Sequence, residues 1–381
     1  MKILSVSLAV VVILALLSVG VIFAVSNFIK VKQETGAKMD VDIAKNKTAL
    51  SPNKLNPQNP KKEVVLDVKW GNEENNFKMS VYQEAKDTPI SYETPSSYAV
   101  DNEGNIYVDD ILNNKLKVFQ NNRLIRSITL PESNIPFVLR DMAVDLDGNI
   151  FGLNYLANEA VKIDKGDRVN AIFKDSKLNR PETLNILSSG NIMIQDNVDS
   201  ENATRVRKFD KNGNIISEKK MANIIDMSLY DYEDQDGDII SISPIGVKNY
   251  QIELKNGADG VRKAIVNFFV EPISNMNCNV ELLGADKLGY LYFRLQDMPQ
   301  PSDKINESDT EKYQQQIKEY ISRIDIKNNK IDTIKIENTD LSMSNSTANL
   351  SNRFIKIDSS GNIYQLMMNK QGYKIVKYSF N

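Results

Sequence analysis

The sequence predicts an all-β fold, a six-bladed β-propeller, and two observations lead to this prediction. The first is a turn of the form Asp-x-x-Gly-Asn-Ile, followed by an aromatic or long apolar residue, which recurs in complete or weaker form. Its glycines are Gly104, Gly148, Gly190, Gly237, Gly289 and Gly361. The second is the spacing of these glycines, which is 44, 42, 47, 52 and 72 residues. A period of about 40 to 50 residues with strand-forming units is typical of propeller blades. Six copies therefore predict six blades.

Each repeat predicts four short strands, named A to D in chain order. Strand A ends at the acidic turn, and strand B follows the Gly-Asn pair, as at Ile106 in the first repeat. A loop leads to strand C, here 115–119, and a turn at 120–122 leads to strand D. Asn and Gly favour such tight hairpin turns because they adopt positive φ at little cost.

The last repeat predicts how the ring of blades closes. It supplies three strands, at 353–358, 362–367 and 374–380, before the sequence reaches Asn381. A strand-like segment at 64–70 precedes the first repeat. We expect this segment to be the outer strand of the last blade, so that the propeller spans 63–381 and its N-terminal strand closes it.

The N-terminal region predicts a membrane anchor. Residues 3–29 carry no charge, and Lys2 and Lys30 flank them, which suits a transmembrane signal-anchor over 1–30. A cleaved signal peptide ending near Ser26 is the alternative. The polar segment 31–62, rich in Pro, Asn and Lys, predicts a flexible linker. We expect a single-pass protein of the cell membrane whose propeller lies on the extracytoplasmic side.

The long interval between the last two glycines predicts an insertion in blade five. The residues from Thr310 to Arg323 have helical character, and Asp309 or Thr310 is suited to cap a helix. We therefore expect a short helical insertion between strands B and C of this blade.

Composition excludes several classes of chemistry. The chain has no histidine, so His general bases and Ser-His-Asp systems are excluded. Cys278 is the single cysteine, which excludes an intrachain disulfide. The 47 basic and 50 acidic residues are spread along the chain and give a net charge of −3, so no nucleic-acid partner is expected. We predict no cofactor, no metal ligands and no catalytic residues.

The repeats resemble the NHL-type six-bladed propellers, in particular the anchored or secreted bacterial type. The first repeat carries this resemblance with the segments 98–101 and 104–108 and with Asp110, Asn113 and Lys115. Blade two departs from the pattern, and blades four to six depart further. Propellers of this type include enzymes, binding modules and scaffolds, so the resemblance implies an architecture without an activity. Asp110 and Asn113 are interpreted as a structural cap of the B–C loop.

Alignment of the repeats on their glycines identifies candidate ligand-binding residues. Eight positions before the glycine, at the start of strand A, the chain carries Arg140, Glu182, Glu281 and Arg353. We expect this position to lie near the propeller axis, on the face of the B–C loops. Two arginines and two glutamates there would bind a charged ligand. The alternative is a ring of salt bridges that rigidifies the centre.

Two functions remain open on the sequence. We favour a membrane-anchored extracytoplasmic module that binds or scaffolds a protein, a peptide or a cell-envelope polymer through its B–C loops and the blade-five insertion. The alternative is a propeller hydrolase or lactonase with a calcium or carboxylate site at the tunnel mouth, for which Glu182 and Glu281 are candidate paired acids. The Asp-x-Asp-Gly segments at 145–148 and 234–237 suggest calcium, but are interpreted as structural turns.

Overall fold

The fold is taken from a computed structural model of the chain. It describes residues 57–83, 90–132, 137–171, 178–187, 189–198, 203–222, 232–233, 238–246, 249–256, 261–269, 277–298, 316–325, 328, 330–338 and 353–381. The expected anchor at 1–30 and most of the expected linker at 31–62 lie outside these residues. None of the helices in the described segments is both long and apolar enough to span a membrane.

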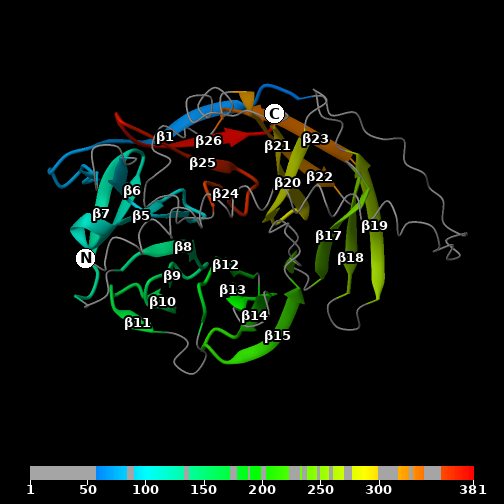
Figure 1. Cartoon of the computed structure of the whole chain (residues 1–381), viewed down its shortest axis with the longest axis horizontal. Coiled ribbons are helices and arrows are strands. Elements are labelled where there is room, and N and C mark those ends of the chain that lie inside the picture. The colour runs from blue at the N-terminus through cyan, green and yellow to red at the C-terminus, as the bar shows by residue number, and fades with distance from the viewer. Residues whose placement is uncertain are drawn as a thin grey trace, which may run out of the picture. The chain divides into compact units, whose positions relative to one another are not determined.

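Six four-stranded antiparallel sheets form most of the described part of the chain, and each is one blade (Figure 1). Blade one comprises β4 (Tyr98–Val100), β5 (Ile106–Asp110), β6 (Lys115–Gln120) and β7 (Arg123–Thr129). Blade two comprises β8 (Leu139–Val144), β9 (Ile150–Asn154), β10 (Glu159–Ile163) and β11 (Val169–Ala171). Blade three comprises β12 (Thr183–Ile186), β13 (Ile192–Val198), β14 (Ala203–Phe209) and β15 (Ile215–Ala222).

The other three blades repeat this arrangement. Blade four comprises β16 (Tyr232–Glu233), β17 (Ile239–Gly246), β18 (Asn249–Lys255) and β19 (Arg262–Phe269). Blade five comprises β20 (Asn277–Ala285), β21 (Tyr290–Met298), β22 (Lys318–Asp325) and β23 (Lys330–Ile336). Blade six comprises β24 (Ile355–Ile357), β25 (Ile363–Asn369), β26 (Gly372–Ser379) and β1 (Lys61–Lys69). A separate hairpin of β2 (Ser80–Tyr82) and β3 (Ser91–Glu93) and the 3-10 helix η1 (Ile111–Asn113) complete the described elements.

The first strand of each blade lies innermost around a common axis. In Figure 1, β8, β12, β20 and β24 surround the centre, whereas β11, β15, β19 and β1 lie at the periphery. The N-terminal strand β1 pairs antiparallel with the C-terminal strand β26, with Lys61 opposite Ser379 and Lys69 opposite Gly372. Segments from the two ends of the described chain thus share one sheet, and the free edge of β26 is covered.

Apolar side chains fill the interfaces between neighbouring blades. Leu66, Phe77, Tyr98, Tyr364 and Tyr373 form one buried cluster between blades six and one. Similar clusters join blades one and two, two and three, four and five, and five and six. Full burial of each such side chain contributes about 1.5 to 3 kcal/mol, so these interfaces supply most of the drive toward folding.

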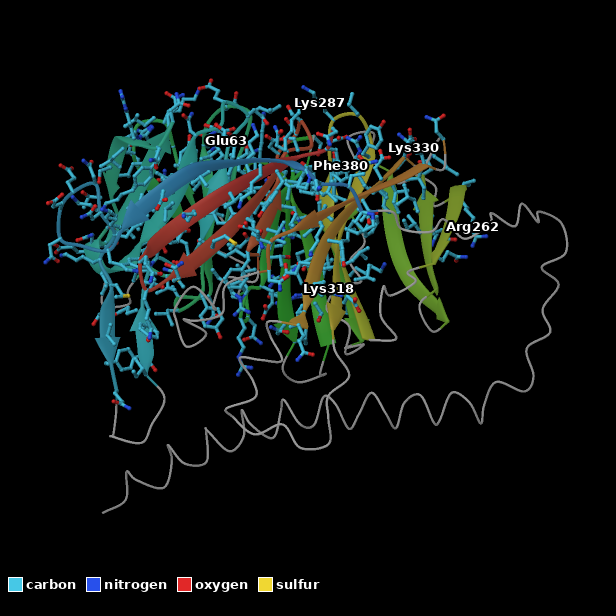
Figure 2. The ribbon with its side chains drawn as sticks, turned by 90° about the horizontal axis from the view of Figure 1, so that it is seen from above. Glu63, Arg262, Lys287, Lys318, Lys330 and Phe380 are labelled. Atoms are coloured by element: carbon cyan, nitrogen blue, oxygen red, sulfur yellow. The ribbon has the colours of Figure 1, made fainter. Side chains whose placement is uncertain are left out.

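Up-and-down strand order gives the ring two distinct faces. The A–B and C–D turns share one face, named the turn face, and the B–C loops lie on the opposite loop face. Figure 2 shows the ring from its edge, with Lys287 of an A–B turn on one side and Lys318, at the start of β22, on the other. The two ends of the central axis are therefore lined by different parts of the repeat.

The recurrent turn owes its sequence to a hydrogen-bonded aspartate. In blade one, Asp101 Oδ1 accepts bonds from the backbone N–H groups of Glu103 and Asn105, both at 2.9 Å, and Asp101 Oδ2 accepts from Tyr107 Oη at 2.9 Å. Gly104 between them has φ +81°, which is favourable for glycine. The same backbone bonds recur at Asp286 and Asp358. The repeated phrase is thus a structural turn with a charged cap.

The helix expected over 310–323 is wrong for its last six residues. Lys318 to Arg323 belong to β22, which pairs with both β21 and β23. Within this stretch Tyr320 and Ile321 are buried. Burial in a sheet and two sets of strand pairing outweigh the modest helix propensity of the Gln, Lys and Glu residues that suggested a helix. The rest of the expected insertion, up to residue 315, lies outside the described residues.

Candidate functional site

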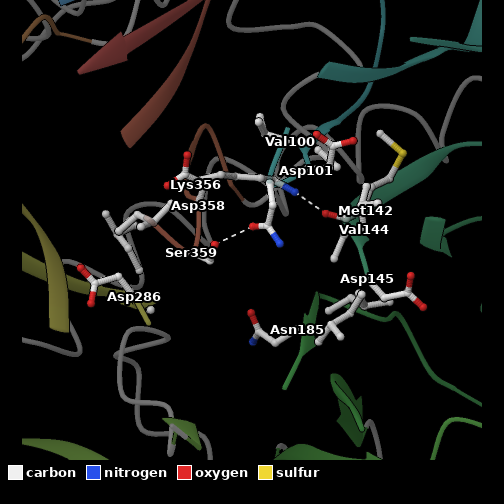
Figure 3. A pocket seen from close by; sticks show the side chains of 18 of the residues that line it. Val100, Asp101, Met142, Val144, Asp145, Asn185, Asp286, Lys356, Asp358 and Ser359 are labelled. Carbon is white, nitrogen blue, oxygen red and sulfur yellow. Dashed lines mark hydrogen bonds between the residues drawn. The ribbon is translucent and has the colours of Figure 1, made fainter. Parts of the chain in front are cut away.

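A cavity of about 500 Å³ lies on the axis of the ring. Its walls come from the innermost strands β4, β8, β12, β20 and β24 and from the turns that follow them. Val100, Val144, Ile186 and Leu283 make parts of the wall apolar. Figure 3 shows Lys356 and Asn185 on opposite sides of its open middle. This volume is within the range of about 300 to 1,000 Å³ that is typical of ligand sites.

The outer end of the cavity lies at the turn face and is acidic. Four turn aspartates and one lysine line it, namely Asp101, Asp145, Asp286, Asp358 and Lys287, so the carboxylates are in excess. Neighbouring turns are joined directly, because Ser359 Oγ donates to Asn102 Oδ1 at 2.6 Å and Lys287 N donates to Ser359 O at 3.0 Å. Leu146 also lines this end and is 84% exposed, so it marks the mouth. Hydrogen bonds hold the aspartates in place but leave their negative charges at the mouth.

The inner part of the cavity is cationic, because Lys356 lies there. Its ammonium donates to Asp141 Oδ1 and to the carbonyl of Met142, both at 2.7 Å. Lys356 belongs to blade six and Asp141 to blade two, so this contact spans the inner end of blade one. On the way, Lys356 Nζ lies 5.5 Å from the ring centre of Tyr98 in blade one. The ammonium therefore joins three blades.

Arg353 and Asn185 lie beside this pair. Arg353 Nη1 donates to Asn185 Oδ1 at 2.8 Å, and its Nε lies 3.8 Å from Asp141 Oδ2. Asp141 Oδ2 also accepts the backbone N–H of Leu184 at 2.9 Å. These contacts connect blades two, three and six around one buried carboxylate.

The electrostatics of this cluster follow from burial and charge pairing. Burial alone would raise the pKa of Asp141, but the Lys356 ammonium and the Arg353 guanidinium hold this pKa below its ordinary value. Burial lowers the pKa of Lys356, and the carboxylate of Asp141 opposes that effect. Each charge of the pair therefore offsets part of the cost of burying the other.

The structure brings together two of the four residues predicted at the start of strand A. Arg140 Nη2 lies 2.5 Å from Glu182 Oε2, and Asn197 Nδ2 donates to Glu182 Oε1 at 2.9 Å. Glu281 lies 3.3 Å from Arg294 within blade five. Of the four predicted residues, Arg353 is the one that lines the cavity.

Two central residues of the site escaped sequence reasoning. Asp141 and Lys356 lie in the middle of innermost strands, where charged residues are seldom fully buried. The sequence Ile355-Lys356-Ile357 indicates a buried charge, since it places a lysine between two β-branched apolar residues of an inner strand. The ammonium of such a lysine needs an acceptor or a negatively charged partner. Nothing in the sequence identifies Asp141 as that partner, because the contact joins residues 215 positions apart.

Other polar residues that the sequence suggested have structural roles. Asn113 Nδ2 donates to Asp110 Oδ2 at 2.7 Å, and Lys117 Nζ lies 2.8 Å from the same oxygen. The Asp110 side chain makes no capping hydrogen bond to η1, so the expected cap is wrong in this respect. Asp145 Oδ1 accepts the N–H of Asn149 at 2.8 Å, as expected for a turn cap. Among the described residues, no group of three or more His, Cys, Asp or Glu is arranged to hold a metal ion. Residues 234–237 and the side chain of Cys278 lie outside the description.

A further buried carboxyl group, that of Asp109, lies in blade one. Asp109 Oδ2 accepts Ser96 Oγ at 2.6 Å and the N–H of Leu139 at 2.8 Å, whereas its Oδ1 has no partner among the described residues. Burial raises the pKa of Asp109 to about 7, against the effect of these two hydrogen bonds. This group therefore titrates near neutral pH.

Comparisons with known proteins find solved structures that resemble this chain at low sequence identity. No protein-family model matches the chain, and no curated protein matches it in sequence. Structures similar to this chain include a streptogramin B lyase, at 14% identity, a TM-score of 0.41, and coverage of 85% of this chain and 98% of the lyase. A virginiamycin B lyase from Staphylococcus aureus is 13% identical, with a TM-score of 0.43 and coverage of 80% and 100%. A gluconolactonase from Xanthomonas campestris is 10% identical, with a TM-score of 0.43 and coverage of 84% and 100%.

At such identities no activity is transferred from these proteins. The class of protein follows from the strand pairings of this chain itself, which define an all-β six-bladed propeller with an axial cavity. The resemblance to NHL repeats stays a prediction.

Proposed function

We propose that this protein is a membrane-anchored, extracytoplasmic propeller that binds a protein, a peptide or a cell-envelope polymer. The observation that carries the proposal is the axial cavity, with charged groups from several blades at its inner end. An uninterrupted salt-bridge network would need no such space, whereas a ligand needs both space and fixed polar groups.

The anchor and the location of the propeller are supported by the uncharged segment 3–29 and its flanking lysines. Cell fractionation tests this part of the proposal. We expect the full chain to remain in the membrane pellet after a high-salt wash, and a variant that lacks residues 1–30 to be released. Release of the full chain by salt alone would contradict an integral anchor.

The four predicted residues have different proposed roles. Arg353 lines the cavity and is proposed to contact the ligand. Arg140 and Glu182 form a salt bridge and are proposed to act on the ligand only by holding the innermost strands. Glu281, paired with Arg294, is proposed to do the same in blade five.

Photo-crosslinking in intact membranes tests the binding role. A photoreactive residue in place of Leu146 would lie at the cavity mouth, since Leu146 is 84% exposed and lines this end. The matched control is Val261, which is 61% exposed and precedes β19, at the periphery of the turn face. We expect a discrete adduct from position 146 and none from position 261. Equal adducts, or none, would contradict binding at the cavity.

The second candidate, a hydrolase or lactonase, remains an alternative. Its calcium version predicts that calcium raises the melting temperature of the chain and that EDTA reverses the effect. The binding role predicts no shift with calcium and no turnover of lactones or glycosides. Turnover that is lost when Glu182 and Glu281 are both changed to Gln would favour the hydrolase or lactonase over the binding role.

A further inference from the structure

We propose that the axial cavity binds short linear peptides with free termini, with the C-terminal carboxylate at the inner end and the N-terminal ammonium at the mouth. This inference rests on the proposed binding function and specifies its ligand. It comes from the way in which charge changes along the cavity, from cationic groups on the inner strands to carboxylates on the turns.

The inner end offers donors for a carboxylate. A lysine ammonium has three N–H groups, and within the described chain Lys356 uses two of them, toward Asp141 and the Met142 carbonyl. The third is available for a ligand. Asn185 accepts from Arg353 through Oδ1, so its amide NH2 group is the part that is left to donate. Both side chains line the cavity.

Hydrogen bonds from charged donors to a carboxylate are the strong kind, especially where water is scarce. Arg353 adds a guanidinium that Asn185 holds in a fixed position. An anionic group at this end therefore meets a preorganised cationic site rather than a flexible surface.

The mouth attracts the opposite charge. Asp101, Asp145, Asp286 and Asp358 line it, and their turn hydrogen bonds fix the carboxylates in place. A wholly anionic ligand would be repelled by this rim, where four carboxylates exceed the one ammonium of Lys287. A wholly cationic ligand would be repelled at the inner end, where Lys356 and Arg353 exceed the one carboxylate of Asp141. A ligand with a negative group at one end and a positive group at the other fits both ends.

The dimensions agree with a peptide of about two to four residues. Asp358 follows Lys356 by two residues and Arg353 by five, which at about 3.3 Å per strand residue corresponds to roughly 7 to 16 Å. An extended tetrapeptide spans about 13 Å. Aliphatic side chains between the charged ends, among them Val144 and Ile186, suit small apolar side chains of the peptide.

Calorimetry with the full chain in phospholipid nanodiscs tests the inference. The probe is tetraalanine with both termini free, compared with its C-terminal amide and its N-acetyl form. We expect the free peptide to bind, amidation to weaken binding at least tenfold, and acetylation to weaken it severalfold. Equal affinity for the free and amidated peptides would overturn the inference, because the inner cations would then contribute nothing.

Variants identify the residues responsible. We expect Lys356→Met to weaken tetraalanine binding about tenfold, and Lys335→Met, on the exposed face of the outer strand β23, to leave it unchanged. Because Lys356→Met also breaks a buried ion pair, Asn185→Leu is the second variant, with an expected severalfold loss. The fluorescence of Trp70, the single tryptophan, shows whether each variant is folded. Unchanged affinity in folded variants of both kinds would overturn the assignment.

The failure of this inference is distinguishable from failure of the binding role. An adduct from position 146 in membranes, together with no binding of tetraalanine, would overturn the peptide inference and leave the binding role in place. Loss of both the adduct and the peptide binding would overturn both.

Discussion

Lys356 of blade six donates a 2.7 Å hydrogen bond to Asp141 of blade two and passes over the ring of Tyr98 in blade one on the way. Successive propeller blades are joined mainly by apolar packing. The ion pair between Lys356 and Asp141 instead links two blades that are not neighbours in the ring. It holds the inner ends of three blades at one position and shapes the inner end of the axial cavity.

A double-mutant cycle measures how strongly this pair is coupled. Breaking a buried ion pair by removing one partner leaves an uncompensated charge and costs about 3 to 5 kcal/mol. We therefore expect Lys356→Met and Asp141→Leu each to lower the unfolding free energy by about 3 kcal/mol, and the double variant to lose less than the sum. Urea unfolding of the full chain in detergent, followed by Trp70 fluorescence, gives the three values. Additive losses would contradict direct coupling.

The stability of the chain depends on pH through Asp109. Its pKa is raised from 3.8 to about 7, so between about pH 4 and 7 the folded state keeps a proton that the unfolded state releases. The contribution of Asp109 to the free energy of unfolding is therefore present at low pH and is lost as the pH rises toward 7. The total loss is on the order of a few kcal/mol.

Asp109→Asn removes this dependence. The amide oxygen still accepts from Ser96 and Leu139, and no charge is buried. We expect the variant to be about 2 kcal/mol more stable than the wild type at pH 8, with less than half of that difference at pH 5. Urea unfolding at the two pH values measures this. A difference that does not change with pH would show that Asp109 does not titrate in this range.

Tyr292 supports the blade-five turn from the following strand. Its hydroxyl donates to Asp286 Oδ2 at 2.8 Å, and the ring is 1% exposed. A hydrogen bond to a charged acceptor contributes about 1.5 to 3 kcal/mol, so Tyr292→Phe should destabilise the chain by about 1.5 kcal/mol. Tyr82→Phe, at a residue that is 53% exposed, is the control and should change stability by less than about 0.5 kcal/mol. Similar effects from both changes would refute this role.

Ring closure by β1 predicts a contrast between two of its residues. Leu66 is fully buried in the cluster between blades six and one, whereas Val64 is 45% exposed. We expect Leu66→Ala to cost about 2 to 5 kcal/mol and Val64→Ala less than about 0.5 kcal/mol, measured by thermal or urea unfolding. If Leu66→Ala had no effect, β1 would not be part of the folded ring in solution.

The repeat itself explains how much of the fold the sequence could predict. Each Asp-x-x-Gly turn is local, because Asp101 bonds to Glu103 and Asn105 within four residues, so its residues are readable in sequence. The segment from Lys318 to Arg323 was misread as helix because its strand state depends on β21 and β23, which lie elsewhere in the chain. Local signals are visible in sequence, and pairing partners are not.

The candidate site shows the same contrast between local signals, which the sequence reveals, and long-range contacts, which it does not. Position within the repeat identified Arg140, Glu182, Glu281 and Arg353, and Arg353 lines the cavity. It did not identify Asp141 or Lys356, since their contact joins residues in different blades. Binding at the loop face stays a prediction, and the rim of the cavity consists of A–B turns of the turn face.

The central claim, that the cavity mouth is occupied by a partner in the membrane, is tested most directly by cysteine labelling. In a Cys278→Ser background, Leu146→Cys and Val261→Cys would each be labelled with a membrane-impermeant maleimide, in intact cells and in the purified full chain. We predict that position 146 reacts several times more slowly in cells than after purification, whereas position 261 reacts equally in both. Equal rates at position 146 in the two settings would contradict the account, and no reaction of either position in intact cells would contradict the extracytoplasmic location.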